Sequence, residues 1–340
     1  MYKNLFRPLL FCLDPEKAHN LTIQLLRLAG AVPPVDYALR QIFAARSHGN
    51  MAVEAFGLKF ANPVGLAAGY DKDALAWRGL AALGFGHIEV GTVTPRSQEG
   101  NLKPRVFRIP EEQAVINRMG FPGHGADFVA KQLSIPRRPS SVILGVNIGK
   151  NKDTPNEEAA RDYVFLLEKF SPLADYLTVN ISSPNTVGLR RLQARDFLEG
   201  LLKQLAVKRA ALDFSRPILV KLAPDLTDQE LDDALAAITT AGMDGVIATN
   251  TTIGREGLRS SLGQETGGLS GAPLKARSLE IVRQIHNKTN GRLPIVGVGG
   301  IMNPDDAKAM LDAGASLIQL YTGMVYSGPG LVKEIMMMLC

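Results

Sequence analysis

Asparagine and lysine side chains recur just after short apolar runs of the chain. Asn147 stands in NIGKN, Asn180 in NISSPNT and Asn250 in TNTT, while Lys72 and Lys221 follow two further runs. An asparagine amide both donates and accepts hydrogen bonds. A site rich in Asn, Thr and Lys therefore predicts a planar ligand that is held through many neutral hydrogen bonds.

The same segments are poor in groups that perform hydrolysis or bind metals. The paired carboxylates that glycoside cleavage requires are missing, since the nearest acid, Asp71, stands alone. The five histidines are scattered, without an HExxH pattern or a His/Cys cluster. We therefore expect no metal site and no hydrolytic activity.

Glycines indicate a second kind of ligand contact. Gly297, Gly299 and Gly300 form GxGG in GVGGI, and Gly271 ends a stretch rich in Gly and Ser. Backbone N–H groups at such positions bind phosphate in many barrels. The GxGG spacing differs from the GxGxxG of dinucleotide-binding folds, and no Walker A sequence occurs. These features predict a planar, phosphorylated cofactor, and flavin mononucleotide (FMN) fits.

The elements that must position these residues are eight short runs rich in Val, Ile and Leu, each followed by a segment with helical periodicity. Nearly continuous apolar runs are typical of parallel strands covered by helices. Thr227 and Glu230 form a capping box, and Asn303 with Pro304 begins another helix. We predict an α/β fold, a (β/α)8 TIM barrel with an N-terminal helical extension. The predicted strands are residues 63–67, 87–93, 142–148, 176–181, 218–222, 245–249, 294–298 and 317–321.

Three segments interrupt this alternation of strands and helices. Residues 51–60 and 105–117 are predicted to form short antiparallel hairpins, the first of which closes the floor of the barrel. Residues 260–271 are rich in Gly and Ser and show no periodicity. We expect a long loop there, close to the ligand.

The N-terminal region combines cations with apolar helices. Asp14 as N-cap, Pro15 at the first helical position and Gly30 as C-cap predict one helix, and a second is expected over residues 35–45. Residues 1–46 hold six basic and three acidic side chains, a net +3 of the chain's +5. This composition is typical of an interfacial anchor, or these helices form an additional layer packed on the barrel. The predicted apolar face of the first helix is Ala18, Leu21, Leu25 and Leu28.

These features divide the chain and limit its partners. We predict a membrane-associating helical region over residues 1–46 and an FMN-binding barrel over residues 47–340. No apolar run approaches the roughly 20 residues of a membrane span, and the N-terminal segment lacks the pattern of a secretory signal. No run of five or more Lys or Arg occurs, so we expect no nucleic-acid partner.

Nine motifs occur in order over nearly the whole chain: NPVGLAAGYDKD, EVGTVTP, NRMGF, NIGKNKDT, NISSPNT, KLAPD, IATNTT, GGLSG and VGVGGI. Together they resemble the motifs of class 2 dihydroorotate dehydrogenases. The resemblance implies oxidation of dihydroorotate to orotate in pyrimidine biosynthesis, with one FMN per chain. It also implies that electrons pass to a membrane quinone, ubiquinone or menaquinone, through a tunnel beneath the N-terminal helices. A peripheral position on the cytoplasmic face of a bacterial inner membrane is expected on this basis.

The resemblance also implies roles for individual residues. Ser183 is the expected base, taking a proton from substrate C5 while C6 gives hydride to the flavin, and Thr186 with Phe121 is the expected proton relay. His19 and Arg108 are expected at the quinone, with a purely structural role as the alternative for His19. The expected flavin contacts are Ala68, Gly69, Tyr70, Asp71, Lys72, Thr92, Asn147, Asn180, Lys221, Thr249, Gly271, Gly300, Tyr321 and Thr322. The expected substrate contacts are Lys72, Asn117, Arg118, Met119, Gly120, Phe121, Asn180, Asn185, Asn250 and Thr251.

The implied ligands suit the chemistry of these side chains. Orotate is a flat ring with a carboxylate, which Lys72 would neutralise, and with imide-like edges that asparagines can pair with. Lys221 beside the flavin would stabilise negative charge on the reduced ring. Serine is a weak base, so Ser183 needs a relay that removes its proton.

Two other functions remain open at this stage. The chain is alternatively a soluble FMN barrel oxidoreductase that uses fumarate or a nicotinamide and ignores quinones. The soluble class resembles this chain but uses a cysteine as base, and neither Cys12 nor Cys340 lies near the motifs. A membrane-binding module on an inactive barrel is the second alternative, and it would bind no flavin. The colour of the purified protein and a quinone-reduction assay distinguish the three.

Overall fold

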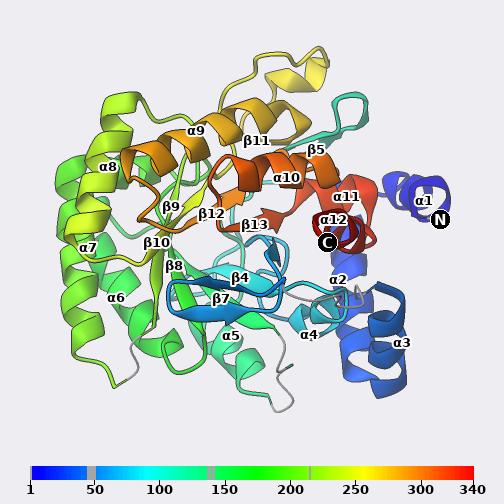
Figure 1. The fold of residues 1–340 in the computed structure, drawn as a ribbon, viewed down its shortest axis with the longest axis horizontal. Coiled ribbons are helices and arrows are strands. Elements are labelled where there is room, and N and C mark those ends of the chain that lie inside the picture. The colour runs from blue at the N-terminus through cyan, green and yellow to red at the C-terminus, as the bar shows by residue number, and fades with distance from the viewer. Residues whose placement is uncertain (1, 44–50, 136–138, 140–141, 214–215) are drawn as a thin grey trace.

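Eight parallel strands close into a barrel in the order β10-β12-β13-β3-β4-β7-β8-β9 (Figure 1). The computed structural model describes residues 2–43, 51–135, 139, 142–213 and 216–340, so the predicted division at residue 46 lies outside it. All eight predicted strands are confirmed, to within one residue at each end. Their bounds are β3 (Val64–Leu66), β4 (His87–Val93), β7 (Ile143–Ile148), β8 (Tyr176–Asn180), β9 (Ile218–Leu222), β10 (Gly245–Ala248), β12 (Ile295–Val298) and β13 (Leu317–Leu320).

Helices cover the outside of the barrel and connect successive strands (Figure 1). The predicted capping box of Thr227 and Glu230 is present at the start of α8, and Asn303 caps α10. Gly242 follows α8 with a φ of +66°, a left-handed conformation that suits glycine. The helices are α4 (Trp77–Ala81), α5 (Ala126–Leu133), α6 (Ala159–Phe170), α7 (Arg195–Ala210), α8 (Asp228–Thr240), α9 (Lys275–Lys288), α10 (Pro304–Asp312), α11 (Thr322–Ser327) and α12 (Leu331–Leu339).

The first hairpin closes the amino-terminal end of the barrel, as predicted. Strands β1 (Val53–Ala55) and β2 (Leu58–Phe60) pair antiparallel. The buried ring of Phe60 lies 5.4 Å from the imidazole of His87, measured between centroids, and Phe56 lies 6.3 Å from Tyr176. Aromatic side chains therefore seal this end of the barrel, and the polar strand ends lie at the opposite one.

The second predicted hairpin is also confirmed, but it has an additional strand. Strands β5 (Val106–Ile109) and β6 (Ala114–Asn117) pair antiparallel, and β11 (Gly268–Gly271) pairs with the other edge of β6. The prediction of a loop through residue 271 is therefore wrong for its last four residues. Their strand conformation depends on a partner that is distant in the sequence, and no local pattern indicates it.

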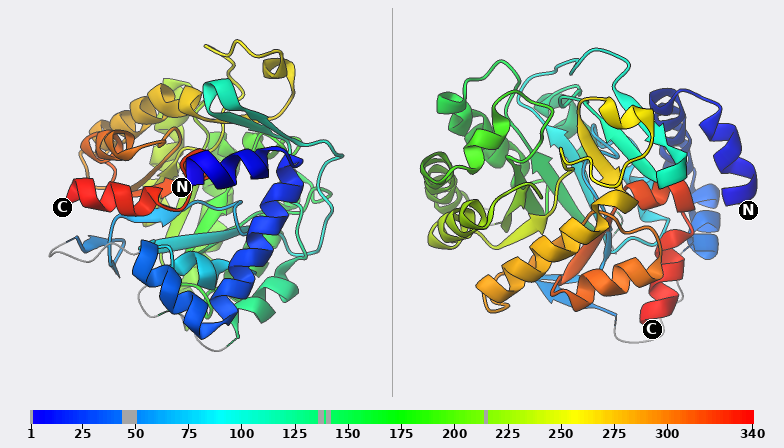
Figure 2. Two further views of the ribbon diagram at one scale, coloured as in Figure 1. Left: turned by 90° about the vertical axis from the view of Figure 1, so that its right-hand side faces the viewer. Right: turned by 90° about the horizontal axis from the view of Figure 1, so that it is seen from above.

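The N-terminal helices lie together on one side of the barrel, next to α12 (Figures 1 and 2). Asp14 caps α2 by accepting hydrogen bonds from the backbone N–H groups of Glu16 and Lys17, as predicted for this position. None of the helices in the described residues combines the length and apolar character that a bilayer span requires. The segment comprises η1 (Tyr2–Phe6), α1 (Arg7–Phe11), α2 (Pro15–Ala31) and α3 (Pro33–Phe43).

Gly30 does not end α2, so its predicted role as C-cap is wrong. The helix continues to Ala31 and its C-cap is Val32. A Cβ at Gly30 would lie 2.5 Å from the backbone nitrogen of Gly79, because α2 and α4 touch there through their backbones. Glycine is required at this position for the close approach of two helices rather than for helix termination.

The predicted apolar face of α2 is mostly exposed. Ala18 is buried, whereas Leu21, Leu25 and Leu28 are 45%, 58% and 63% exposed. The helix instead buries Ile23, which packs with the residues of the barrel core. An exposed row of leucines on a helix that is anchored from its other side leaves an apolar surface facing outward.

The buried His87 makes stability depend on pH. Burial lowers the pKa of His87 to about 3, and neither ring nitrogen has a hydrogen-bond partner among the described residues. The folded chain stays neutral there while the unfolded chain binds a proton below about pH 6.5, so stability is lost as the pH falls from that value. We expect His87→Gln to reduce this loss by up to about 1.4 kcal/mol per pH unit between about pH 6.5 and 4. Urea denaturation at several pH values measures it, and equal slopes in the two proteins would contradict it.

Candidate active site

A cavity of about 1260 Å³ opens at the carboxyl ends of the barrel strands and extends to the N-terminal helices. Its lining includes residues at or just after the carboxyl ends of β3, β4, β8, β10, β12 and β13, and residues of β5, β6, β9, β11, α1, α2 and α3. The predicted site residues that line it are His19, Ala68, Gly69, Tyr70, Lys72, Thr92, Arg108, Asn117, Met119, Gly120, Phe121, Asn180, Ser183, Asn185, Lys221, Thr249, Asn250, Thr251, Gly271, Gly300, Tyr321 and Thr322. The predicted residues outside its lining are Asp71, Arg118, Asn147 and Thr186.

Three polar side chains form a buried hydrogen-bonded cluster at the base of the cavity. The Thr92 hydroxyl donates to Asn147 Oδ1 at 2.5 Å. The Asn180 amide donates to Thr92 Oγ1 at 2.9 Å and to Asn147 Oδ1 at 3.1 Å. Asn147 therefore acts from behind the cavity wall, where it fixes the orientation of two side chains that do reach the cavity.

The wall formed by β9, β11 and β12 suits an anionic, phosphorylated cofactor. Lys221 lines it and is 5% exposed; burial lowers its pKa, and the carboxylate of Glu89 opposes this shift. Gly271 and Gly300 have φ values of +101° and +75°, and a Cβ on either would meet other atoms at 2.2 and 2.3 Å. The backbone itself forms the cavity surface at both glycines, an arrangement in which N–H groups bind phosphate. These residues fit FMN.

Asparagines surround the substrate end of the cavity. Asn185 Nδ2 donates to Asn117 Oδ1 at 3.1 Å, and Asn250 Nδ2 donates to Ser182 Oγ at 3.0 Å. Asn185 Oδ1 is buried and has no hydrogen-bond partner among the described residues. Since a buried acceptor without a partner costs free energy, this oxygen is suited to an N–H donor of a ligand.

Lys72 supplies a positive charge to this end. Its ammonium donates to the carbonyl oxygen of Gly69 at 2.9 Å. Burial lowers the pKa of Lys72, while the nearby carboxylates of Asp73 and Glu16 oppose the shift. An anionic group bound beside Lys72 would stabilise its protonated form further.

Two hydroxyl groups with unused hydrogen-bonding capacity lie three residues apart after β8. Ser183 Oγ accepts a hydrogen bond from the backbone N–H of Asn185 at 3.2 Å, which leaves its own proton available. Thr186 Oγ1 is buried and has no partner among the residues that the structure describes. Phe121 has a φ of +54°, which is uncommon for a residue with a side chain, and its ring lies over Gly149. This ring covers the cavity close to Thr92.

Asp71 and Arg118 make structural contacts away from the cavity. The Asp71 carboxylate accepts hydrogen bonds from the backbone N–H groups of Leu75 and Ala76, both at 2.8 Å. Burial raises the pKa of Asp71 to about 6, and these two N–H groups oppose the shift. Arg118 forms an ion pair with Glu265 at 2.6 Å. The Asp71 side chain thus binds backbone N–H groups and the Arg118 side chain binds Glu265, whereas the predicted contacts were with the flavin for Asp71 and with the substrate for Arg118.

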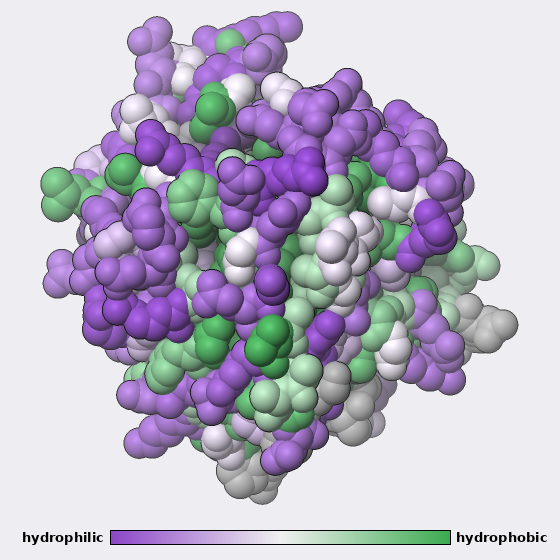
Figure 3. All heavy atoms as spheres, turned by 90° about the vertical axis from the view of Figure 1, so that its left-hand side faces the viewer, coloured by the Kyte–Doolittle hydropathy of each residue, from purple (hydrophilic) through white to green (hydrophobic). Residues whose placement is uncertain are grey.

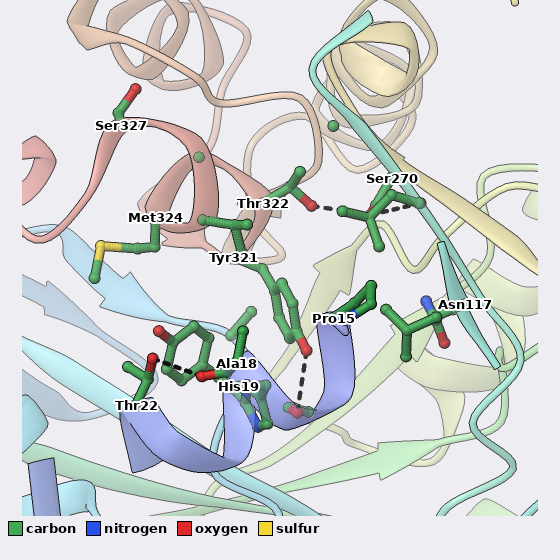
Figure 4. Close-up of a pocket in the computed structure, with 18 of the residues that line it drawn as sticks. Pro15, Ala18, His19, Thr22, Asn117, Ser270, Tyr321, Thr322, Met324 and Ser327 are labelled. Atoms are coloured by element: carbon green, nitrogen blue, oxygen red, sulfur yellow. Dashed lines mark hydrogen bonds between the residues drawn. The ribbon is translucent and has the colours of Figure 1, made fainter. Parts of the chain in front are cut away.

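The rings of His19, Tyr70 and Tyr321 form a row in the lining of the cavity, and Figure 4 shows His19 and Tyr321. The centroid of Tyr70 lies 5.3 Å from His19 and 5.5 Å from Tyr321, both edge to face. The Tyr321 hydroxyl donates to Gly69 O at 3.3 Å. Burial, reinforced by the charge of Lys72, lowers the pKa of His19 to about 3, so the imidazole is neutral. These three rings therefore carry no charge near pH 7.

Arg108 marks the helix end of the cavity. Its guanidinium donates to the carbonyl oxygen of Leu10 at 3.1 Å and lies 4.4 Å from the centroid of the Phe11 ring. His19 and Arg108, both predicted to lie at the quinone, therefore line the same cavity, His19 from α2 and Arg108 from β5.

Glu16 of α2 and Arg105 form an ion pair that no sequence motif indicates. The two side chains are 14% and 7% exposed, and Arg105 Nη2 lies 2.7 Å from Glu16 Oε1. Arg105 also donates to the carbonyl oxygens of Glu99 and Asn101, at 2.6 and 2.9 Å. It therefore joins α2 to the segment that leads into β5.

The fold and the site define a TIM-barrel enzyme with a cavity for a planar, polar ligand that continues beneath N-terminal helices. A family model described as dihydroorotate dehydrogenase matches residues 50–340. The chain belongs to the dihydroorotate dehydrogenase family and is an oxidoreductase.

Curated relatives and solved structures agree with this assignment. The dihydroorotate dehydrogenase (quinone) of Roseiflexus castenholzii is 51% identical over 98% of this chain and 91% of its own length. That of Acidithiobacillus ferrooxidans is 52% identical over 99% of this chain and 94% of its own. A ligand-free DHODH structure from Eimeria tenella is 40% identical and covers 96% of this chain and 94% of its own, with a TM-score of 0.87.

The contact between Glu16 and Arg105 is expected to contribute measurably to stability. Glu16→Gln leaves the buried guanidinium without its carboxylate, so we expect a loss of about 1–3 kcal/mol in the free energy of unfolding. Lys103 also pairs with Glu16, at 3.4 Å, but its side chain is 67% exposed. Lys103→Gln is the matched control and should cost less than about 1 kcal/mol. Urea denaturation compares the two, and equal effects would show that the buried pair is not stabilising.

Proposed function

We propose that this chain carries out the reaction of its family, the oxidation of dihydroorotate to orotate in pyrimidine biosynthesis, at the mouth of the barrel, and that a quinone accepts the electrons. The observation that carries the proposal is a single cavity that joins polar strand ends to apolar helices. A polar substrate and an apolar quinone thereby reach one cofactor from different ends. The helical region of residues 1–46 serves the quinone, and residues 47–340 hold the cofactor and the substrate.

Lys72 and the asparagines bind the substrate. The ammonium of Lys72 neutralises the substrate carboxylate, and Asn185 Oδ1, which lacks a partner among the described residues, accepts a ring N–H. Asn117 and Asn250 complete the hydrogen bonds to the ring edges. Together these contacts hold C6 of the ring towards the cofactor and C5 towards Ser183. Met119, Gly120, Phe121, Asn180 and Thr251 line the remaining wall.

Ser183 is the base that removes the proton from C5. Its Oγ accepts a backbone hydrogen bond, which holds the hydroxyl in place at the cavity wall. As Ser183 takes the C5 proton, its own hydroxyl proton would pass to a water molecule under Phe121 and to Thr186, which relay it onward to solvent because neither hydroxyl can retain it. The buried Thr186 hydroxyl without a partner among the described residues supports this relay.

One FMN per chain fits the wall that contains Lys221, Gly271 and Gly300. The flavin, when bound, accepts the hydride from C6. Lys221 stabilises negative charge that develops on the ring, and the backbone at the two glycines binds the phosphate. The other contacts are Ala68, Gly69, Tyr70, Lys72, Thr92, Asn180, Thr249, Tyr321 and Thr322.

The quinone, ubiquinone or menaquinone, enters between the N-terminal helices. Leu9, Leu21 and Leu25 line this end of the cavity, and His19 and Arg108 provide its polar contacts. Three uncharged rings separate the quinone from the substrate. They are His19, Tyr70, which contacts His19, and Tyr321, which contacts Tyr70.

The exposed apolar surface of the N-terminal helices binds the membrane peripherally. Leu25 and Leu28 of α2 and Tyr37 and Ile42 of α3 are more than half exposed there. The face on the far side of the barrel is mostly hydrophilic, with apolar residues scattered over it (Figure 3). Basic residues of the N-terminal region add attraction to anionic lipid, about 1 kcal/mol each. We assign this contact to the cytoplasmic face of a bacterial inner membrane.

Replacement of the base tests the chemical step. Ser183→Ala should slow flavin reduction by dihydroorotate about 100- to 10,000-fold, because general base catalysis has this magnitude. Anaerobic stopped-flow absorbance at about 450 nm, where oxidised flavins absorb, measures the rate. Reoxidation of the chemically reduced variant by a quinone analogue should remain at the wild-type rate. A reduction rate within tenfold of wild type would exclude Ser183 as the base.

A charge on the exposed helix face tests membrane binding. Leu28→Glu should weaken binding to anionic lipid vesicles at least about tenfold, because it removes apolar contact area and adds repulsion. Val207→Glu is the matched control, since Val207 is 66% exposed on α7, on the other side of the barrel. Co-sedimentation with vesicles compares the two variants, and flavin reduction by dihydroorotate should be normal in both. An equal loss of binding would show that the N-terminal face is not the membrane contact.

A further inference from the structure

Glu89 of β4 is fully buried inside the barrel and has no role in the mechanism above. Its carboxylate accepts four hydrogen bonds, from the Asn147 amide at 2.8 Å, the Gln319 amide at 3.0 Å and the hydroxyls of Tyr176 and Thr178, both at 3.1 Å. In these four hydrogen bonds both carboxylate oxygens act only as acceptors. A buried charge of this kind is stable only with a compensating one.

Lys221 provides the opposite charge. It lies on β9, paired in register with Asn180 of β8, and its side chain faces the cofactor end of the cavity. Within the described part of the chain its ammonium has no hydrogen bond or close ion pair, and burial lowers its pKa. The carboxylate of Glu89 is the group that opposes this shift.

Among the described residues, Lys72 is a second cation of the cavity but is not a charge that acts on Lys221, and the aromatic and imidazole groups inside the barrel are neutral near pH 7. Burial and the Glu89 charge raise the pKa of Tyr176 well above its ordinary value. Burial raises the pKa of Tyr321 to about 12 and lowers that of His87 to about 3. The remaining inward side chains next to Lys221, such as Thr178 and Asn180, carry no charge. Within the described part of the chain, Glu89 is therefore the charged group that favours the protonated form of Lys221.

We propose that Glu89 is a positioning residue of the cofactor site, the counterion that keeps Lys221 cationic where the flavin binds. The inference rests on the proposed function, because it assigns Lys221 to the flavin. Four donors from three strands hold the carboxylate rigidly, so its field on Lys221 is constant. Asn147 connects the same carboxylate to Thr92 and Asn180, which line the cavity.

Glu89→Gln tests the proposal, because it keeps the shape of the side chain and removes its charge. Lys221 should then lose its proton at a pH lower by about one to three units. Reduction of the flavin would then be accompanied by protonation of Lys221. The midpoint potential of the flavin should therefore fall with pH at about twice the wild-type slope over the pH range in which Lys221 is deprotonated in the oxidised protein. Spectroelectrochemistry of the FMN-loaded protein from pH 6 to 9 measures this, independently of turnover.

Two variants separate the electrostatic role from a structural one. Glu89→Gln/Lys221→Met contains no titrating lysine, so the steeper interval should disappear in it. Thr178→Val removes one donor to the carboxylate but keeps both charges, so its titration should match wild type. A Glu89→Gln protein with the wild-type slope throughout, or a steep interval that persists in the double variant, would overturn the proposal.

The same variants remain decisive if Glu89→Gln does not fold. An uncompensated buried lysine would cause this, and removal of both charges in Glu89→Gln/Lys221→Met should then restore folding. Failure of both proteins to fold would show that Glu89 acts in packing and would overturn the proposal. A wild-type protein that binds no FMN would instead contradict the proposed function itself, so the two failures are distinguishable.

Discussion

Polar side chains enclosed by a closed barrel must pair with one another or with a ligand, and this requirement determines where the site forms. The parallel strands bring their carboxyl ends to one cavity. There Thr92, Asn147 and Asn180 satisfy each other, while Asn185 retains an acceptor without a partner among the described residues. The groups that remain unsatisfied inside a rigid wall are those that a ligand can use.

The barrel could be predicted from the sequence because its strands are specified locally. A strand covered by helices is apolar along its whole length, and this pattern requires no knowledge of its neighbours. Strand β11 contains glycines and a serine, and it is a strand only because β6 pairs with it. The prediction that Gly30 is the C-cap of α2 is wrong for a related reason. A glycine near the end of a helix has the same appearance whether it ends the helix or, as here, allows contact with Gly79.

The candidate site could be predicted to the extent that its residues occur in motifs after strands. Most of them line the cavity, but the sequence does not distinguish a side chain that reaches it from one that supports it. Asn147 and Asp71 belong to motifs yet act behind the wall. Glu89 lies in a segment whose sequence predicts a buried strand, and that pattern does not identify the partners of its carboxylate. Arg105 contacts Glu16 only because the tertiary fold brings the two residues together. Such partners depend on three-dimensional proximity and leave no local signal.

The ion pair of Glu16 and Arg105 fixes α2 to the segment that precedes β5. The guanidinium of Arg105 donates hydrogen bonds to the carbonyl oxygens of Glu99 and Asn101 and also forms the ion pair with Glu16 of α2. Movement of α2 away from this segment would separate one buried charge pair. The affinity of any compound that requires such a movement would therefore be reduced by the free energy of that separation.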